Sequence, residues 1–328
     1  MKNIQADIKS GNFKQVYLLY GEEAYLKQQY KQNLVKALNP DGDTMNFNHY
    51  EGKGIDVKQL IDLCETMPFF AERRVVLLED TGFFKNKCEE LADYMKELPD
   101  YLYLVFAETE VDKRNRMYKA VKACGSIAEF IRQDEKTLMR WAAGILGKAG
   151  KKITQRDMEL LLTKTGTDMG NLRMEMEKLI SYTEGRDVVT AEDIEEICTT
   201  QTTNRIFDMV RAVTEKNQKR ALELYYDLLT LKEPPMRILF LLAKQYRQLL
   251  LAKQFAAAGL AQTEIASKLG VPGFVVRNIT TCARADTISE LEQAVKDFVD
   301  AEESVKTGRL EDKLSVELLI IKYSSKVK

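Results

Sequence analysis

Short apolar runs alternate with amphipathic stretches over the first 130 residues of the chain. The runs Val-Val-Leu-Leu at 75–78 and Leu-Tyr-Leu-Val-Phe at 102–106 are almost continuously apolar, as in strands that helices cover on both faces. This alternation at helical spacing is typical of βαβ units with a parallel sheet. The predicted strands are residues 16–20, 45–50, 74–78, 101–106 and 126–130, and the predicted helices between them are 24–37, 56–66, 87–97 and 115–123.

The strand pattern stops at Phe130, and the rest of the chain has helical periodicity broken by Gly, Pro and Thr-Asx turns. Thr154 suits a helix N-cap, and Thr190 with Asp193 resembles a capping box. Longer helices follow from Arg205 onward. The sequence therefore predicts an α/β domain with a parallel sheet and helices on both faces over 1–138, a small helical domain over 139–205 and an all-α domain over 206–328.

Composition narrows the class of protein. A length of 328 residues indicates roughly two or three domains. A hydrophobic content of 45% with 30% charged residues is that of an ordinary water-soluble chain. The 49 basic and 50 acidic residues nearly cancel, so any contact with nucleic acid or a membrane must be local.

Metal chemistry, disulfides and membrane insertion are not expected. The five cysteines are scattered without CxxC spacing and His49 is the single histidine, so neither a zinc site nor a His-based triad is predicted. No apolar run approaches the ~20 residues that span a bilayer. The N-terminal stretch also lacks the apolar region of a signal peptide. We expect a cytoplasmic protein without a metal and without contact to a membrane.

The stretch VYLLYGEEAYLKQQY, residues 16–30, stands where a nucleotide-binding protein of this pattern carries its phosphate loop. Such a loop needs several glycines, inward-pointing backbone N–H groups and a lysine. This junction offers Gly21 alone, followed by Glu22 and Glu23, whose charges would repel a triphosphate. The two acids are interpreted as helix-start residues that suit the helix dipole. The sequence thus predicts a degenerate phosphate loop, no cofactor and no catalytic residue.

Three other groups of residues have a structural interpretation as well as a functional one. Strand-end acids such as Glu79 and Glu108 could hold Mg²⁺, but without a phosphate loop they are interpreted as solvated. The basic stretch 113–122 could meet phosphates, and it is interpreted as a solvated helix face. Residues 262–284 have the spacing of a helix-turn-helix. The would-be recognition helix offers only Arg277 and Asn278 as polar readers, and its Phe274, Val275 and Val276 favour a packing role.

The stretch ETMPFFAERR places large apolar side chains in a connection. Apolar residues at helical spacing predict a helix over 57–64, which should end near Pro68 because residues before a proline avoid the helical region. Met67, Phe69 and Phe70 therefore fall between a surface helix and a strand, where loops run over the surface. Residue types leave two readings open: these side chains fold back into the core, or they form a hydrophobic plug for a partner's pocket.

Six segments stand in a characteristic order along the chain. They are VYLLYGEEAYL, MPFFAERRVVLLED, DKRNRMYKAVKACG, GTDMGNLRMEMEKLISY, RIFDMVRAV and KQYRQLLLAK. In this order and spacing they resemble one family, the delta subunit of the bacterial clamp loader (DNA polymerase III delta subunit). The resemblance covers essentially the whole chain, and the order of the segments is more specific than any one of them.

The resemblance implies an AAA+-like α/β domain, then a small helical lid, then a helical collar that mediates oligomerisation. It also implies a member of this ATPase superfamily that does not bind ATP, in agreement with the residues at Gly21. The chain has no Ser-Arg-Cys triplet, the motif that carries the arginine finger in related loader subunits. By the resemblance, the clamp-binding element is the loop after the second helix, here Met67, Pro68, Phe69 and Phe70.

The function implied is mechanical. A delta subunit would bind the sliding clamp (the beta subunit) and open it for loading onto primed DNA during chromosomal replication, without hydrolysing ATP. Its partners would be the tau/gamma ATPase and delta-prime subunits in a hetero-pentamer, which would contact the primed DNA. The collar would assemble through apolar helix faces such as Ile238, Leu241, Leu242 and Leu249.

Catalysis is not expected of the chain itself, although the complex is a component of the DNA-directed DNA polymerase holoenzyme. Two alternatives stay open on the sequence. One is an ATP-hydrolysing AAA+ ATPase of the loader type. The other is a helix-turn-helix protein that reads DNA with residues 262–284.

Overall fold

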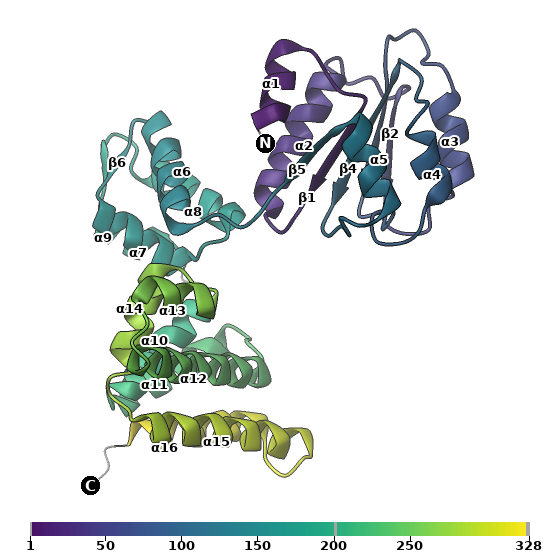
Figure 1. Cartoon of the computed structure of the whole chain (residues 1–328). Helices are drawn as coiled ribbons and strands as arrows, with labels where there is room; N and C mark the ends of the chain where they lie inside the picture. The colour runs from purple at the N-terminus through teal and green to yellow at the C-terminus, as the bar shows by residue number, and fades with distance from the viewer. Residues whose placement is uncertain (1, 200–201, 326–328) are drawn as a thin grey trace. The chain divides into compact units, whose positions relative to one another are not determined.

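The computed structural model describes residues 2–199 and 202–325, without the side chains of Lys2, residues 202–204 and Phe274. The chain divides between Gln133 and Asp134 into two compact units (Figure 1). The first unit contains a parallel sheet of five strands, and the second is built from helices with one two-stranded ribbon.

The five strands of the first unit pair in the order β2-β3-β4-β1-β5, and every pair is parallel. Parallel neighbours need crossover connections, which the intervening helices supply. The predicted α/β fold with a parallel sheet, followed by an all-α part, is confirmed. The strands are β1 (Val16–Tyr20), β2 (Phe47–Glu51), β3 (Arg74–Glu79), β4 (Leu102–Glu108) and β5 (Ser126–Glu129).

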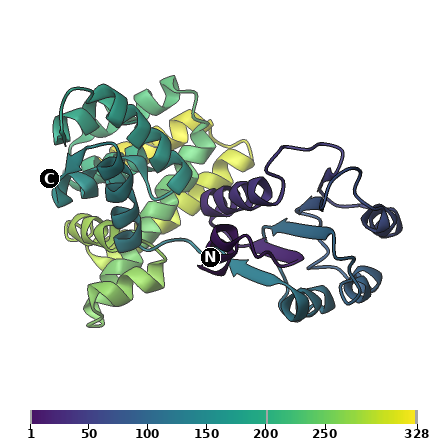
Figure 2. The ribbon, with the colours of Figure 1, turned by 90° about the horizontal axis from the view of Figure 1, so that it is seen from above.

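Helices cover both faces of this sheet (Figures 1 and 2). Side chains alternate between the faces along a strand, so in β1 Leu18 enters one apolar cluster and Leu19 the other. Both faces are therefore dry, which explains the continuous apolar runs. The first cluster includes side chains of α3 (Val57–Glu65), α4 (Glu89–Tyr94) and α5 (Arg116–Cys124), and the second those of α1 (Lys2–Ser10) and α2 (Ala24–Leu38).

The second unit is helical from α6 onward. The predicted N-cap at Thr154 and the capping box of Thr190 with Asp193 are both present. The ribbon of β6 (Lys152–Ile153) and β7 (Val188–Val189) was not predicted, because two residues carry no periodicity. The helices are α6 (Glu135–Lys148), α7 (Gln155–Thr165), α8 (Met169–Tyr182), α9 (Ala191–Ile197), α10 (Thr202–Thr214), α11 (Gln218–Thr230), α12 (Pro235–Ala257), α13 (Gln262–Leu269), α14 (Gly273–Cys282), α15 (Ile288–Lys306) and α16 (Asp312–Ser324).

Two apolar cores lie within this second unit. One is formed by buried side chains of α6 to α9, and the other by those of α10 to α16. Val275 of α14 packs against both cores. The two cores thus belong to one compact unit, and the division into a lid and a collar near residue 205 stays a prediction.

The apolar residues of α12 do not form a free assembly surface. Ile238, Leu242 and Leu249 are buried in the core of their own unit, and Leu241 is half-buried against it. The prediction that these side chains join the subunits of a ring is wrong. A helix with apolar residues on much of its surface is covered on several sides by its own chain.

Replacing Leu242 by Ala is expected to destabilise the second unit by about 2–5 kcal/mol, because it removes buried methyl groups from a packed core. Leu318→Ala, the same change at a position 47% exposed, is expected to alter stability by less than about 0.5 kcal/mol. Urea unfolding followed by the fluorescence of Trp141, the only tryptophan and a residue of this unit, measures both. Equal losses in the two variants would contradict the core assignment of Leu242.

Candidate functional site

The two sites predicted in the first unit lie at opposite edges of its sheet. Gly21 follows the last residue of β1 and so lies at the carboxyl edge. Met67 to Phe70 precede β3 and so lie at the amino edge. Apolar side chains fill the region between the two ends of the strands, so the two predicted sites are separate.

The backbone at Gly21 is closed by the chain itself. Gly21 has φ of +125°, and a Cβ atom there would stand 2.3 Å from the carbonyl oxygen of Phe130. That oxygen accepts a hydrogen bond from the N–H of Glu23 (3.0 Å), and the N–H of Phe130 donates to the oxygen of Tyr20 (2.7 Å). A phosphate loop needs this space and these N–H groups for its ligand. Here the residue after β5 occupies the space.

The neighbouring polar groups are likewise engaged by the protein. Helix α2 begins at Ala24, with Glu23 as an N-cap residue whose side chain makes no capping bond. Glu22 lies before it and forms an ion pair with Arg132 (3.4 Å). The ammonium of Lys27 donates to the backbone oxygen of Glu108 (2.9 Å), and burial lowers its pKa. Lys27 is therefore bonded to the protein and is not presented at Gly21 as the lysine of a phosphate loop would be.

Glu79 at the end of β3 is partly exposed, whereas Glu108 at the end of β4 is buried. Glu108 is buried, and its carboxylate accepts from the N–H of Thr81 (3.0 Å) and from its hydroxyl (2.6 Å). Desolvation raises the pKa of Glu108, with those hydrogen bonds acting against the rise. The interpretation of these acids as solvated is wrong for Glu108, which ties the ends of two strands together.

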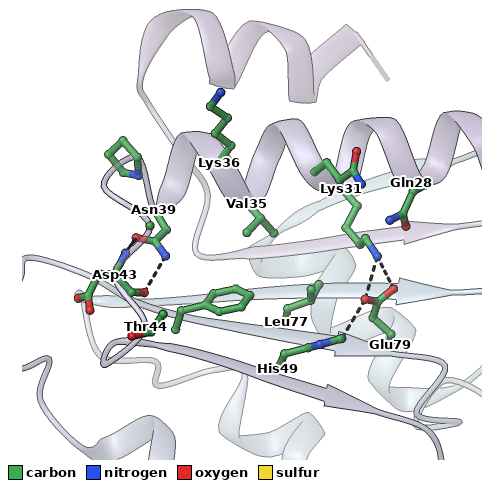
Figure 3. A pocket seen from close by; sticks show the side chains of 14 residues that line it. Gln28, Lys31, Val35, Lys36, Asn39, Asp43, Thr44, His49, Leu77 and Glu79 are labelled. Carbon is green, nitrogen blue, oxygen red and sulfur yellow. Dashed lines mark hydrogen bonds and ion pairs between the residues drawn. The ribbon is translucent and has the colours of Figure 1, made fainter.

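A cavity of about 620 Å³ lies between α2 and the edge strand β2 (Figure 3). Glu79 points into it and pairs with Lys31 (2.6 Å) and with Nε2 of His49 (2.9 Å). Lys31 and His49 thus both contact the carboxylate of Glu79. At the opposite end of the cavity the loop after α2 carries Asn39 and Asp43, which bond to each other.

The loop after α3 exposes three large apolar side chains. Met67 is 74% exposed, Phe69 56% and Phe70 94%. The two rings meet edge to face, with centroids 4.5 Å apart, which is a favourable aromatic geometry. The structure contradicts the reading in which these side chains fold back into the core. They form an apolar knob at the amino edge of the sheet.

Buried polar side chains hold the backbone of this loop. Arg74, the first residue of β3, donates from Nε to the carbonyl oxygen of Thr66 (2.9 Å) and from Nη2 to that of Met67 (3.3 Å). Asn46 bonds both backbone polar groups of Phe69. Phe70 has φ of +48°, a left-handed conformation that costs energy in a bulky residue. The hydrogen bonds from Arg74 and Asn46 therefore stabilise a backbone conformation that the isolated loop would not favour.

Sequence reasoning missed Asn46 and Arg74. Arg74 gave a weak signal, since a charged residue at the head of the apolar run at 75–78 calls for a partner. Asn46 gave none, because its role depends on the pairing of β2 with β3.

Four of the charged residues considered for nucleic-acid binding form ion pairs within the chain. In the helix-turn-helix stretch the side chain of Val276 is buried in the core, as the packing role requires. Arg277 and the first three cations of the basic stretch each have an acidic partner, which would compete with a phosphate for them. The pairs are Lys113 with Glu129 (2.9 Å), Arg114 with Asp112 (3.1 Å), Arg116 with Asp93 (2.6 Å) and Arg277 with Glu159 (3.4 Å).

Two further observations concern the described residues alone. Within 2–199 and 202–325 no three His, Cys, Asp or Glu side chains gather in a way that could hold a metal ion. In the same part of the chain no helix has both the length and the apolar character needed to cross a membrane.

The fold is that of a DNA clamp loader protein. The solved structure of the Bacillus subtilis DNA clamp loader delta protein superposes with a TM-score of 0.67 at 24% identity, over 99% of both chains. Among curated proteins, DNA polymerase III subunit delta of Bacillus subtilis is 26% identical over 97% of this chain and 95% of its own. The probable DNA polymerase III subunit delta of Aquifex aeolicus is 21% identical over 85% and 83%.

Two family models match the chain. The model of the DNA polymerase III delta subunit matches residues 17–130, and that of its C-terminal domain matches residues 203–323. The first match spans the parallel sheet, and the second spans α10 to α16. The chain belongs to the DNA polymerase III delta subunit family.

Replacing Gly21 by Ala is expected to destabilise the first unit by roughly 2–4 kcal/mol, because a methyl group would collide with the main chain of Phe130. Gly11→Ala is the matched control, since Gly11 has φ of +70° but nothing within 4 Å of its Cβ position. It should lose only about 1 kcal/mol, the cost of a left-handed alanine. Hydrogen exchange of β1 and β4 in the full chain measures both. Similar losses in the two variants would remove the close approach as the cause.

Proposed function

We propose that this chain binds the sliding clamp through Met67, Pro68, Phe69 and Phe70 and opens it for loading onto DNA. The observation that carries the proposal is the apolar knob, two exposed aromatic rings that meet edge to face on a loop whose backbone is hydrogen-bonded to buried side chains. Membership of the delta family supports the choice of the sliding clamp as the partner. An exposed apolar group of this kind marks an interaction site rather than a folding element.

The knob has the features of an energetic anchor. Binding energy at protein interfaces concentrates in a few aromatic side chains that enter desolvated pockets. Phe70 is almost fully accessible, so all of its ring surface is available for burial by a partner. Met67 stands on the same loop and, on this proposal, braces the aromatic pair against the rim of the clamp pocket.

Opening the clamp requires more than holding it. A binder shifts the equilibrium between a closed and an open clamp only by its difference in affinity for the two forms. On this proposal the first unit contacts the open form more strongly, so that binding and opening are one event. ATP binding in the partner ATPase subunits would control whether the knob is presented.

We also propose that the chain itself neither binds nor hydrolyses ATP. The support is the closure at Gly21, where the backbone of Phe130 takes the place of a phosphate. The nearest lysines of α2 support it too, because Lys27 and Lys31 are bonded to the protein. The energy for loading would then come from the tau/gamma ATPase of the complex.

Assembly with tau/gamma and delta-prime needs an apolar surface on the second unit. Exposed apolar side chains of α11 and α16 are the candidates, in place of the buried residues of α12. These helices pack together, and the hydroxyl of Tyr226 donates to Glu317 (2.9 Å). We propose Tyr226, Leu314 and Leu318 as part of this surface. The complex would act in the cytoplasm and contact the primed DNA.

Phe69→Ala/Phe70→Ala is expected to weaken binding of the full chain to its sliding clamp by about thirtyfold or more, because truncating a buried aromatic anchor costs about 2 kcal/mol. Phe240→Ala, at an exposed aromatic of α12, is the control and should bind normally. Surface plasmon resonance with immobilised clamp measures the affinities, and circular dichroism checks the fold. Unchanged affinity in a folded double variant would remove the knob from the interface.

Titration of the full chain with Mg²⁺–ATP is expected to show no saturable binding at about 1 mM nucleotide. The reason on this proposal is steric, since the main chain of Phe130 packs against Gly21 and engages the N–H of Glu23. Isothermal calorimetry measures binding, and phosphate release measures hydrolysis. Micromolar affinity accompanied by hydrolysis would favour the alternative, a working loader-type ATPase.

A further inference from the structure

One buried side chain engages the whole peptide backbone of Phe69. Asn46 is 3% exposed and lies directly before β2. Its Oδ1 accepts from the N–H of Phe69 (2.7 Å), and its Nδ2 donates to the carbonyl oxygen of Phe69 (2.8 Å). The amide therefore bonds the donor and the acceptor of one residue, as a neighbouring strand would.

Asn46 is itself fixed on the sheet and on its own loop. Its carbonyl oxygen accepts from the N–H of Val75, which prolongs the ladder between β2 and β3. Its Nδ2 also donates to Oδ2 of Asp43 (2.5 Å). This hydrogen bond is the main reason that the pKa of Asp43 lies below its usual range, so the carboxylate stays an acceptor.

The same chain of bonds reaches helix α2. The N–H of Asp43 donates to Oδ1 of Asn39 (2.9 Å), and Nδ2 of Asn39 donates back to the carbonyl oxygen of Asp43 (2.9 Å) (Figure 3). Asn39 is the residue that ends α2. Polar contacts thus run without a break from the end of a packed helix, through Asp43 and Asn46, to the backbone that carries the aromatic pair.

We propose that Asn46 is a positioning residue, a latch that holds Phe69 and Phe70 in the orientation in which a partner binds them. This inference rests on the proposed clamp-binding function and adds a residue to it. The left-handed conformation of Phe70 supports it, because a strained residue keeps its shape only when its surroundings impose it. The knob is then ordered before the partner arrives.

Order before binding has a measurable consequence. A flexible loop loses conformational freedom when its side chains enter a pocket, and a loop already fixed does not. Removing the latch should therefore weaken binding although Asn46 itself touches no partner. Asn46→Ala deletes both bonds to Phe69, whereas Asn46→Asp keeps the acceptor, deletes the donor and brings a second carboxylate to Asp43.

The first arm of the test uses the free chain. Amide exchange of Phe69, followed by NMR, should be slow in the unmodified chain because its N–H is bonded to a buried side chain. Exchange should accelerate by at least about tenfold in Asn46→Ala. Asn33→Ala, at an exposed asparagine of α2, is the control and should leave it unchanged. Full protection of the Phe69 amide in Asn46→Ala would overturn the proposal.

The second arm is a double-mutant cycle on affinity for the sliding clamp. Asn46→Ala should weaken binding about tenfold, with Asn46→Asp in between. In the Phe69→Ala/Phe70→Ala background the same change should have no further effect, because a latch acts only through what it holds. An equal loss in both backgrounds would assign Asn46 a general structural role and overturn the proposal.

The two arms also separate this inference from the function on which it rests. If the unmodified chain fails to bind the clamp, the clamp-binding proposal falls, and the exchange of the Phe69 amide still shows whether Asn46 holds the loop. If binding is normal and exchange accelerates without loss of affinity, the function stands and the positioning role of Asn46 falls.

Discussion

Burial of both faces of the five-stranded sheet is the constraint on which the rest of the first unit depends. Helices on each side exclude water from the middle of β1, β3 and β4, so polar groups of these strands gather at the strand ends. The edges have been used differently. At the carboxyl edge the chain packs against itself at Gly21, and at the amino edge a short loop extends Phe69 and Phe70 into solvent.

The amino edge combines exposed apolar side chains with buried polar ones, the reverse of the usual arrangement. Asn46 and Arg74 are buried, and both bond the loop backbone, which satisfies polar groups that the turn would otherwise leave without a partner. The loop can then show its aromatic rings to solvent without collapsing onto the sheet. The bonds from Asn46 and Arg74 thus hold the backbone of the loop, and its aromatic rings stay exposed.

Periodicity in the sequence was sufficient for the five strands and the helices between them, because alternation and helical spacing are local. Periodicity failed where an element has few apolar residues, and where a role depends on a contact between residues far apart in the sequence. Helix α1 anchors itself through Ile4, too little apolar surface for a recognisable pattern. The apolar residues of α12 were predicted to contact partner subunits, because the sequence does not tell whether an apolar helix face packs against its own chain or against a partner. The loop at Met67 was found by composition, but its support by Asn46 arises from strand pairing that no local pattern contains.

The packing of Gly21 against Phe130 bears on how such a protein can change. What packs against Gly21 is main chain, the carbonyl of a residue that also extends the pairing of β5 with β1. Exchanging Glu22 and Glu23 for glycine, lysine or threonine would alter side chains and leave that carbonyl in place. Opening the space at Gly21 and freeing the N–H of Glu23 would require the segment after β5 to take another path, a remodelling of several residues at once. The closure at Gly21 is therefore a property of the chain path, and exchanges of single side chains in the turn leave it unchanged.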